Sequence, residues 1–234
     1  MNPRDFGRDS WAMLHLTALR ADADSSFDHR GKYSRYIVLF APLVQCVFCR
    51  NDATSFVDTL ATRATDPLPI ARAVEARRAF AWSVELHNMV NRKIAIEKGT
   101  PVTDSQLSLL DARRLWEGQR HLLFKSVWSY LTIVFKHYDA HGSHQKQALY
   151  TELLDVLPAL LGWFMCKGDG GLERSIALMC DVALGGTCTS SNDMLRRLVN
   201  CALAIGHISN AEARQLNTIT DTLRRLSMKK RDPF

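Results

Sequence analysis

Two cysteines separated by two residues, Cys46 and Cys49, are the first candidates for chemistry in this chain. Two thiols at this spacing lie about one helical turn apart, so a disulfide can close between them without backbone movement. At the N-terminus of a helix, the helix dipole also favours the thiolate that carries out thiol–disulfide exchange. The pair could therefore be a redox disulfide, half of a zinc site, or two buried thiols.

A zinc site needs four ligands, and no second C-x-x-C or complete histidine pair supplies the other two. His137, His141 and His144 recur at helical spacing, but Gly142 interrupts that stretch and no cysteine is close in sequence. We therefore predict no metal site. The remaining cysteines are Cys166, Cys180, Cys188 and Cys201. The sequence leaves open whether a shuttle disulfide exists among them, and Cys180–Cys188 is the candidate pair.

A second polar constellation occurs in one helical stretch, His87-Asn-Met-Val-Asn91 followed by Arg92-Lys93. Helical spacing puts His87 and Asn91 on one face, with Asn88 beside them. A buried imidazole and two buried carboxamides each need a hydrogen-bond partner. A flat ligand with polar edges would supply those partners.

Four motifs follow one another along the first half of the chain: Gly7-Arg8-x-x-Trp11-x-x-Leu14-His15, Cys46-x-x-Cys49, Trp82-x-x-x-x-His87-Asn-x-Val-Asn91-Arg-Lys and Arg113-Arg-Leu-Trp116-x-Gly118. In order and spacing they resemble the Erv/ALR family of FAD-linked sulfhydryl oxidases. The resemblance covers about residues 1–118, and the joint occurrence of the first three motifs is far more specific than any one alone.

This resemblance implies a four-helix bundle with a short fifth helix, which holds FAD between its helices. Cys49 would face the flavin, and Cys46 would exchange with an incoming thiol. By analogy the residues that line the cofactor, with the last closing over it, are Gly7, Arg8, Trp11, His15, His87, Asn88, Val90, Asn91, Lys93 and Trp116. The implied reaction converts thiols of a protein substrate or a thiol carrier protein into a disulfide and passes the electrons to dioxygen, which gives hydrogen peroxide.

The chain departs from the family at one disulfide. The family commonly has a cysteine two residues after the helix tryptophan, paired with another after the following turn. Here Val84 occupies the first position, and no cysteine occurs between Cys49 and Cys166. We therefore predict that this structural disulfide is absent, and that packing replaces its roughly 2 to 4 kcal/mol of stabilisation.

The elements that position these motifs are predicted to be helices. Apolar residues recur at three-and-four spacing along 11–18, 33–43, 56–64 and 80–94, and alternating strand patterns are weak. Gly99 and Pro101 stand where a helix over 80–98 would end. The predicted fold class is all-α.

An internal repeat appears at an offset of 117 residues. Trp11 and Leu14 map onto Trp128 and Leu131, and Cys49 maps onto Cys166. At the same offset His15 becomes Thr132 and Cys46 becomes Trp163. We predict two domains, a sulfhydryl oxidase domain at 1–118 and a degenerate, cofactor-free copy at 119–234. Flavin-free copies of this kind occur in animal and large-DNA-virus relatives, which suggests a viral member. The two bundles would pair within one chain, or the chain would form a homodimer.

Composition places the chain among ordinary globular proteins, with 47% hydrophobic and 23% charged residues in 234. We expect no membrane span and no secretory signal, and hence a cytoplasmic location, which would be host cytoplasm or virion for a viral protein. The net charge of +6 includes a basic C-terminal stretch, which we interpret as a solvated helix end. Two alternatives compete with the oxidase: a non-catalytic helical interaction module with a Cys/His zinc site, and a nucleic-acid-binding protein, which rests on the basic tail alone.

Overall fold

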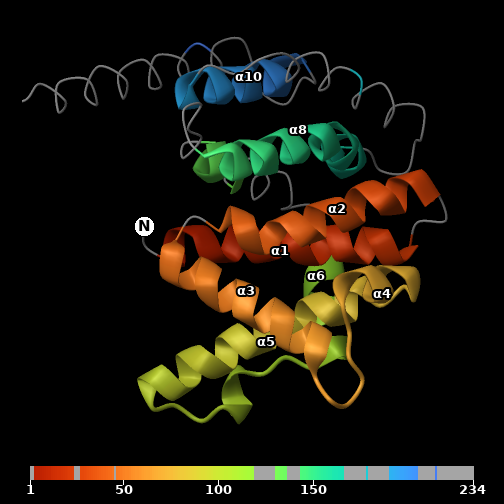
Figure 1. The fold of residues 1–234 in the computed structure, drawn as a ribbon, viewed down its shortest axis with the longest axis vertical. Helices are drawn as coiled ribbons and strands as arrows, with labels where there is room; N and C mark the ends of the chain where they lie inside the picture. The colour runs from red at the N-terminus through yellow and green to blue at the C-terminus, as the bar shows by residue number, and fades with distance from the viewer. Residues whose placement is uncertain are drawn as a thin grey trace, which may run out of the picture. The chain divides into compact units, whose positions relative to one another are not determined.

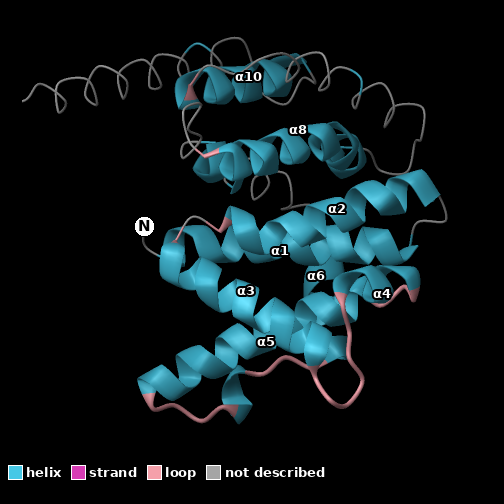
Figure 2. Ribbon diagram, viewed as in Figure 1, coloured by secondary structure: helices cyan, strands magenta, loops and turns pink. Residues whose placement is uncertain are grey.

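The computed structural model describes residues 3–23, 27–44, 46–118, 130–135, 143–165, 178, 190–204 and 214. Every regular element within these ranges is a helix (Figures 1 and 2). The prediction of an all-α protein is therefore confirmed. The chain divides into two compact units, Met1–Tyr130 and Leu131–Phe234. The boundary expected at 118 falls just before residues 119–129, which lie outside the described ranges.

Four long helices build the N-terminal unit: α1 (Pro3–Ala23), α2 (Phe27–Leu43), α3 (Val47–Thr62) and α5 (Ala79–Lys98). Both α1 and α3 pack against α2 and α5, which closes a four-helix bundle (Figure 1). Three short elements accompany it: α4 (Ile70–Glu75), the 3-10 helix η1 (Thr103–Ser105) and α6 (Leu109–Gly118). Of these, α6 packs against α1 and α5, whereas α4 was not predicted from the sequence.

Most residues of the apolar stripes seen in the sequence lie in the core of this bundle, whereas Ile94, at the end of the last stripe, is 40% exposed. In α2 the whole predicted stripe is buried, and its members are Tyr33, Tyr36, Ile37, Phe40 and Leu43. Leu14 and Ala18 of α1 are also buried, as are Phe80, Val84 and Leu86 of α5. Helices with one apolar face must bury it against a neighbour, and four such faces together enclose one core.

The ends of α5 are fixed by two different devices. At its start, the Asp22 carboxylate of α1 accepts hydrogen bonds from the backbone N–H groups of Ala79 (2.8 Å) and Phe80 (2.9 Å). These are N–H groups that a helix leaves without an internal partner, so Asp22 caps α5 from another helix. At its end, Gly99 adopts the left-handed conformation with φ of 64°, which glycine allows at low cost. The predicted end of this helix is thus confirmed.

The C-terminal unit contains a helical stretch at 131–135, α8 (His144–Met165) and α10 (Ser191–Ala204). The Tyr150 hydroxyl donates to the Val134 carbonyl oxygen over 3.0 Å and ties α8 to the first stretch. Among the described helices, none is long and apolar enough to cross a membrane. Several residues discussed above lie outside the described ranges: Trp128, His137, His141, Cys166, Cys180, Cys188 and the basic tail.

Candidate active site

The C-x-x-C pair stands at a helix start. α2 ends at Leu43, and Cys46 is the N-cap residue of α3. The Cys46 sulfur accepts a hydrogen bond from the backbone N–H of Cys49 (3.4 Å), and the Cys49 thiol donates to it over 2.7 Å. Both cysteines are free thiols and partly buried. The sulfurs are close enough for a disulfide to form between them with little movement.

The two thiols have opposite pKa shifts. Burial raises the pKa of Cys46, but hydrogen bonds from the Cys49 thiol and from backbone N–H groups outweigh burial and lower it overall. Burial, followed by the hydrogen bond to Cys46, raises the pKa of Cys49 to about 11. When the reduced pair loses one proton, the negative charge therefore falls on Cys46 rather than Cys49, and the helix start stabilises it there.

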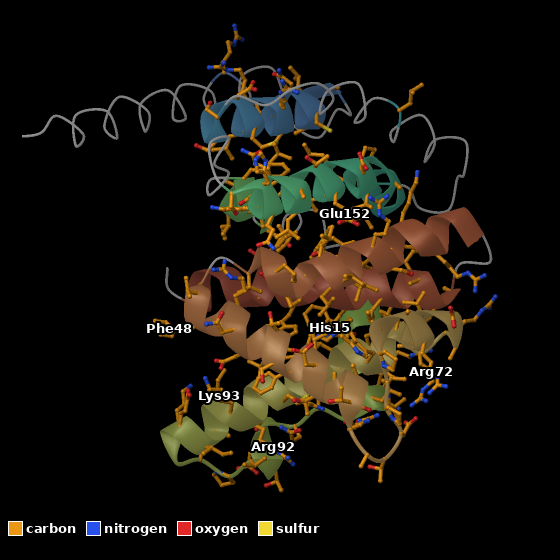
Figure 3. The ribbon with its side chains drawn as sticks, viewed as in Figure 1. His15, Phe48, Arg72, Arg92, Lys93 and Glu152 are labelled. Atoms are coloured by element: carbon orange, nitrogen blue, oxygen red, sulfur yellow. The ribbon has the colours of Figure 1, made fainter. Side chains whose placement is uncertain are left out.

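The residues between the cysteines face solvent. Val47 is 55% exposed and Phe48 is 82% exposed, although both are large and apolar. Figure 3 shows the Phe48 side chain projecting away from α3 at the edge of the N-terminal unit. A second thiol can therefore approach the pair from this side.

An aromatic cluster brings together side chains from α1, α5 and α6. The rings of Trp11 and His87 are stacked, with centroids 4.0 Å apart and an interplanar angle of 10°. The His15 ring lies 5.2 Å from His87 and 5.0 Å from Trp116. His15 is fully buried, and Trp116 is almost so. Four of the residues that the resemblance assigned to the cofactor thus lie together.

Hydrogen bonds join the two histidines to Ser83. His15 Nδ1 lies 2.9 Å from Ser83 Oγ, and His15 Nε2 lies 2.9 Å from His87 Nδ1. Burial lowers the pKa of His15 well below its ordinary value, with the neighbouring His87 adding to the effect, and burial lowers the pKa of His87 to about 4. Both rings are therefore neutral at pH 7.

The two asparagines hold the segment that follows α5. The Asn88 side chain donates to the Leu107 carbonyl oxygen (2.9 Å) and accepts from the Leu107 N–H (3.0 Å). It thus satisfies both backbone groups of Leu107. Asn91 donates to the Ser105 carbonyl oxygen over 3.0 Å. Gln106 donates back to the Asn88 carbonyl oxygen over 3.1 Å. These bonds fasten residues 105–107 to α5, directly before the helix that carries Trp116.

Comparison with known proteins bears on the same region. Residues 8–109 match the model of the Erv1/Alr family, and the matched range includes both cysteines, the aromatic cluster except Trp116, and both asparagines. Residues 8–109 are an Erv1/Alr family domain.

One curated relative of this chain is the mitochondrial FAD-linked sulfhydryl oxidase ERV1 of Saccharomyces cerevisiae. It is 27% identical over 89 residues, which cover 38% of this chain and 42% of the yeast protein. The chain therefore matches less than half the length of that relative. No solved structure matches the chain.

A charged contact links two helices of the Erv1/Alr domain near the cysteines. The Lys93 ammonium group of α5 pairs with the Asp52 carboxylate of α3 and with Glu97 at 3.2 Å. Figure 3 labels Lys93 on α5. Asp52 lies three residues after Cys49, and its charge also contributes to the raised pKa of that thiol. The ion pair therefore joins the cysteine helix to the helix that carries His87.

Three other predicted residues lie on the helices that carry the aromatic cluster, Gly7 and Arg8 on α1 and Val90 on α5. Arg8 is exposed on α1, and Val90 is partly buried on α5. A Cβ atom at Gly7 would meet open space, so the fold itself does not require glycine there.

The Erv1/Alr domain fits a planar cofactor in one further respect. The indole N–H of Trp116 is buried and has no hydrogen-bond partner among the described residues. A buried donor without a partner is costly, and a ligand acceptor would satisfy it. Since this donor belongs to a ring next to His15, the stacked cluster and the orphaned N–H together suit FAD.

Ser83, which binds His15, was not predicted from the sequence. The signal that could have revealed it is a small polar residue in the apolar stripe, between Phe80 and Val84.

Proposed function

We propose that this chain is an FAD-dependent thiol oxidase, which forms disulfides in protein substrates and transfers the electrons to dioxygen. The observation that carries the proposal is the Cys46–Cys49 pair, with its oppositely shifted pKa values, at a helix start within an Erv1/Alr family domain. The stacked aromatic cluster supports the cofactor.

The first step is thiol–disulfide exchange at Cys46. A substrate thiolate attacks the Cys46 sulfur of the oxidised pair, the Cys46–Cys49 bond breaks, and Cys49 leaves with the electron pair. Two of the causes that raise the Cys49 pKa come from Cys46, namely its hydrogen bond and its charge. Both causes disappear once Cys46 is bonded to the substrate, which makes Cys49 a better leaving group at that moment.

The second step releases the product. The substrate's other thiolate attacks the substrate sulfur in the mixed disulfide, forms the product disulfide, and expels Cys46 as a thiolate. The lowered pKa of Cys46 favours this departure, because a thiol of lower pKa leaves faster. The enzyme is left as the reduced pair seen in the structure.

Electrons must then leave the pair so that the Cys46–Cys49 disulfide can form again. Bound FAD would take the electron pair and give it to dioxygen, which becomes hydrogen peroxide with two protons. Trp11, His15, His87 and Trp116 would hold its rings, and Lys93 would supply positive charge beside α3. Since both histidines are neutral at pH 7, they add no charge next to the cofactor.

Physiological partners and location follow from this activity as proposals. The substrate is a protein with two thiols or a thiol carrier protein, in the cytoplasm or, for a viral protein, in the virion. The C-terminal unit is a cofactor-free copy that pairs with the N-terminal one, or the chain forms a homodimer.

Colour and oxygen consumption test the oxidase against the zinc-module alternative. The purified chain should be yellow and should produce one hydrogen peroxide for each dithiothreitol oxidised. A colourless protein that binds zinc and leaves the dithiol reduced would contradict the proposal. Within the described residues, no group of three or more histidine, cysteine or acidic side chains could hold a metal ion.

A further inference from the structure

In the hydrogen bonds around His15, the distances show which atom is the donor and which is the acceptor. The Ser83 hydroxyl lies 2.7 Å from the carbonyl oxygen of Phe80. A carbonyl oxygen can only accept, and two oxygens this close repel unless a proton lies between them. The single proton of Ser83 is therefore directed at Phe80, which leaves the Ser83 oxygen as an acceptor.

This acceptor determines which nitrogen of each histidine is protonated. His15 Nδ1 lies 2.9 Å from the Ser83 oxygen, so Nδ1 carries the proton of the neutral ring. His15 Nε2 is then a lone pair, and the His87 nitrogen that faces it, Nδ1, must be the donor over 2.9 Å. Since His87 is also neutral, its remaining nitrogen, Nε2, carries a lone pair.

We propose that Ser83 is a positioning residue, which sets both histidines in the Nδ1–H form and thereby makes His87 Nε2 an acceptor for a hydrogen-bond donor of the ligand. Within the described residues no donor to His87 Nε2 occurs. A flavin nucleotide carries several N–H and O–H donors that could bind there. That the ligand is a flavin rests on the proposed function, whereas the positions of the histidine protons do not.

Removal of the Ser83 hydroxyl should reverse the whole chain of hydrogen bonds. In Ser83→Ala the His15 Nδ1–H would be buried without an acceptor, which is costly. His15 avoids this cost by moving its proton to Nε2, from which it donates to His87 Nδ1. His87 then carries its proton on Nε2 and presents a donor where the ligand also has a donor. Flavin affinity should fall about tenfold, as expected for the loss of one buried hydrogen bond.

Nitrogen NMR of the full chain with ¹⁵N-labelled histidine tests the proton assignment directly, because the two tautomers of neutral imidazole have different nitrogen shifts. The signals of His15 and His87 are assigned with His15→Gln and His87→Gln variants. We expect the Nδ1–H form at both positions in the wild type, at both in Ser83→Thr, and at neither in Ser83→Ala. The matched control is Thr17→Val, which removes a buried hydroxyl that has no partner among the described residues and should leave both tautomers and flavin affinity unchanged.

Two results would overturn the inference. One is an Nε2–H form at either histidine in the wild type. The other is a Ser83→Ala protein with wild-type tautomers and wild-type flavin affinity. A chain that binds no flavin but shows the expected tautomers would refute the proposed function and leave the role of Ser83 in place.

Discussion

Helices α2 and α8 begin at positions related by the offset of the sequence repeat, but they end differently. Their first residues, 27 and 144, are 117 apart, which is the offset of the sequence repeat. Tyr33 and Tyr150 correspond and are both buried, as are Leu43 and Leu160. The two helices therefore bury the same face, which favours the predicted duplication.

The difference begins directly after that face. α2 ends at Leu43, so that Cys46 can cap a new helix, whereas α8 continues to Met165. The position that corresponds to Cys46, Trp163, thus lies inside a helix rather than at its start. His15 is fully buried in its hydrogen-bond chain, whereas the corresponding Thr132 is exposed. The same apolar pattern can therefore occur without the helix break and the buried polar partners that accompany the cysteine pair.

The largest effect should come from the cysteines that distinguish the two units. Cys49→Ser should lower peroxide production from a dithiol by about a thousandfold or more, because no second sulfur remains to pass on electrons, while flavin stays bound. Cys46→Ser should be equally inactive, and a long-wavelength absorption band should appear as rising pH ionises the buried Cys49 thiol beside the flavin.

Cys201→Ser, at the buried cysteine of α10, is the control for both variants and should retain activity. Near-normal peroxide production in either Cys46→Ser or Cys49→Ser would show that the pair has another role.

The buried histidines should make the N-terminal unit sensitive to acid. The pKa of His87 is about 4 in the folded protein, against 6.5 for an ordinary histidine. Between these values the unfolded chain binds a proton that the folded one does not, so stability falls as pH falls from about 6.5 to about 4. Lowering of the His15 pKa acts in the same direction. The loss assigned to His87 is about 3 kcal/mol.

Urea unfolding at a series of pH values measures this loss. His87→Gln should flatten the pH dependence by that amount, and His144→Gln, at an exposed position of α8, should not. Parallel pH curves for wild type and His87→Gln would contradict the burial of a neutral His87.

A smaller effect, on the rate of flavin release, should follow from loosening the segment before α6. Asn91→Ala removes the hydrogen bond to Ser105 and loosens the approach to Trp116, so flavin release on mild heating should be about tenfold faster. His87→Ala should also release flavin faster, since it removes the ring that stacks on Trp11. Val84→Ala trims only the core and should release flavin at the wild-type rate, although it destabilises the fold. Equal rates of flavin release from all three variants would contradict a role of His87 and Asn91 in holding the cofactor.

Much of the fold could be predicted from local patterns. The buried stripe of α2 and the end of α5 at Gly99 follow from spacing and from one glycine. The cap by Asp22 joins residues 57 positions apart, and the bond between His15 and Ser83 spans 68. No periodicity encodes such pairings, because they form only when helices pack.

The candidate site shows the same limit. The residue types predicted a polar cluster, but the hydrogen bonds of Asn88 and Asn91 to residues 105–107 could not be predicted, since they go to backbone atoms that any sequence would offer. They fasten the stretch after α5, where the chain lacks the disulfide that is common in the family. The bonds that hold this stretch are visible only in three dimensions.

The most direct test is the ratio of bound flavin to protein in the purified full chain, measured from visible absorbance after the protein is denatured and the flavin released. We predict one FAD per chain, held by the unit with the helix break at Cys46 and the two hydrogen-bonded histidines. No flavin, with a protein that is folded and colourless, would contradict the proposed oxidase. Two flavins per chain would show that the C-terminal unit has kept the chemistry that we infer it has lost.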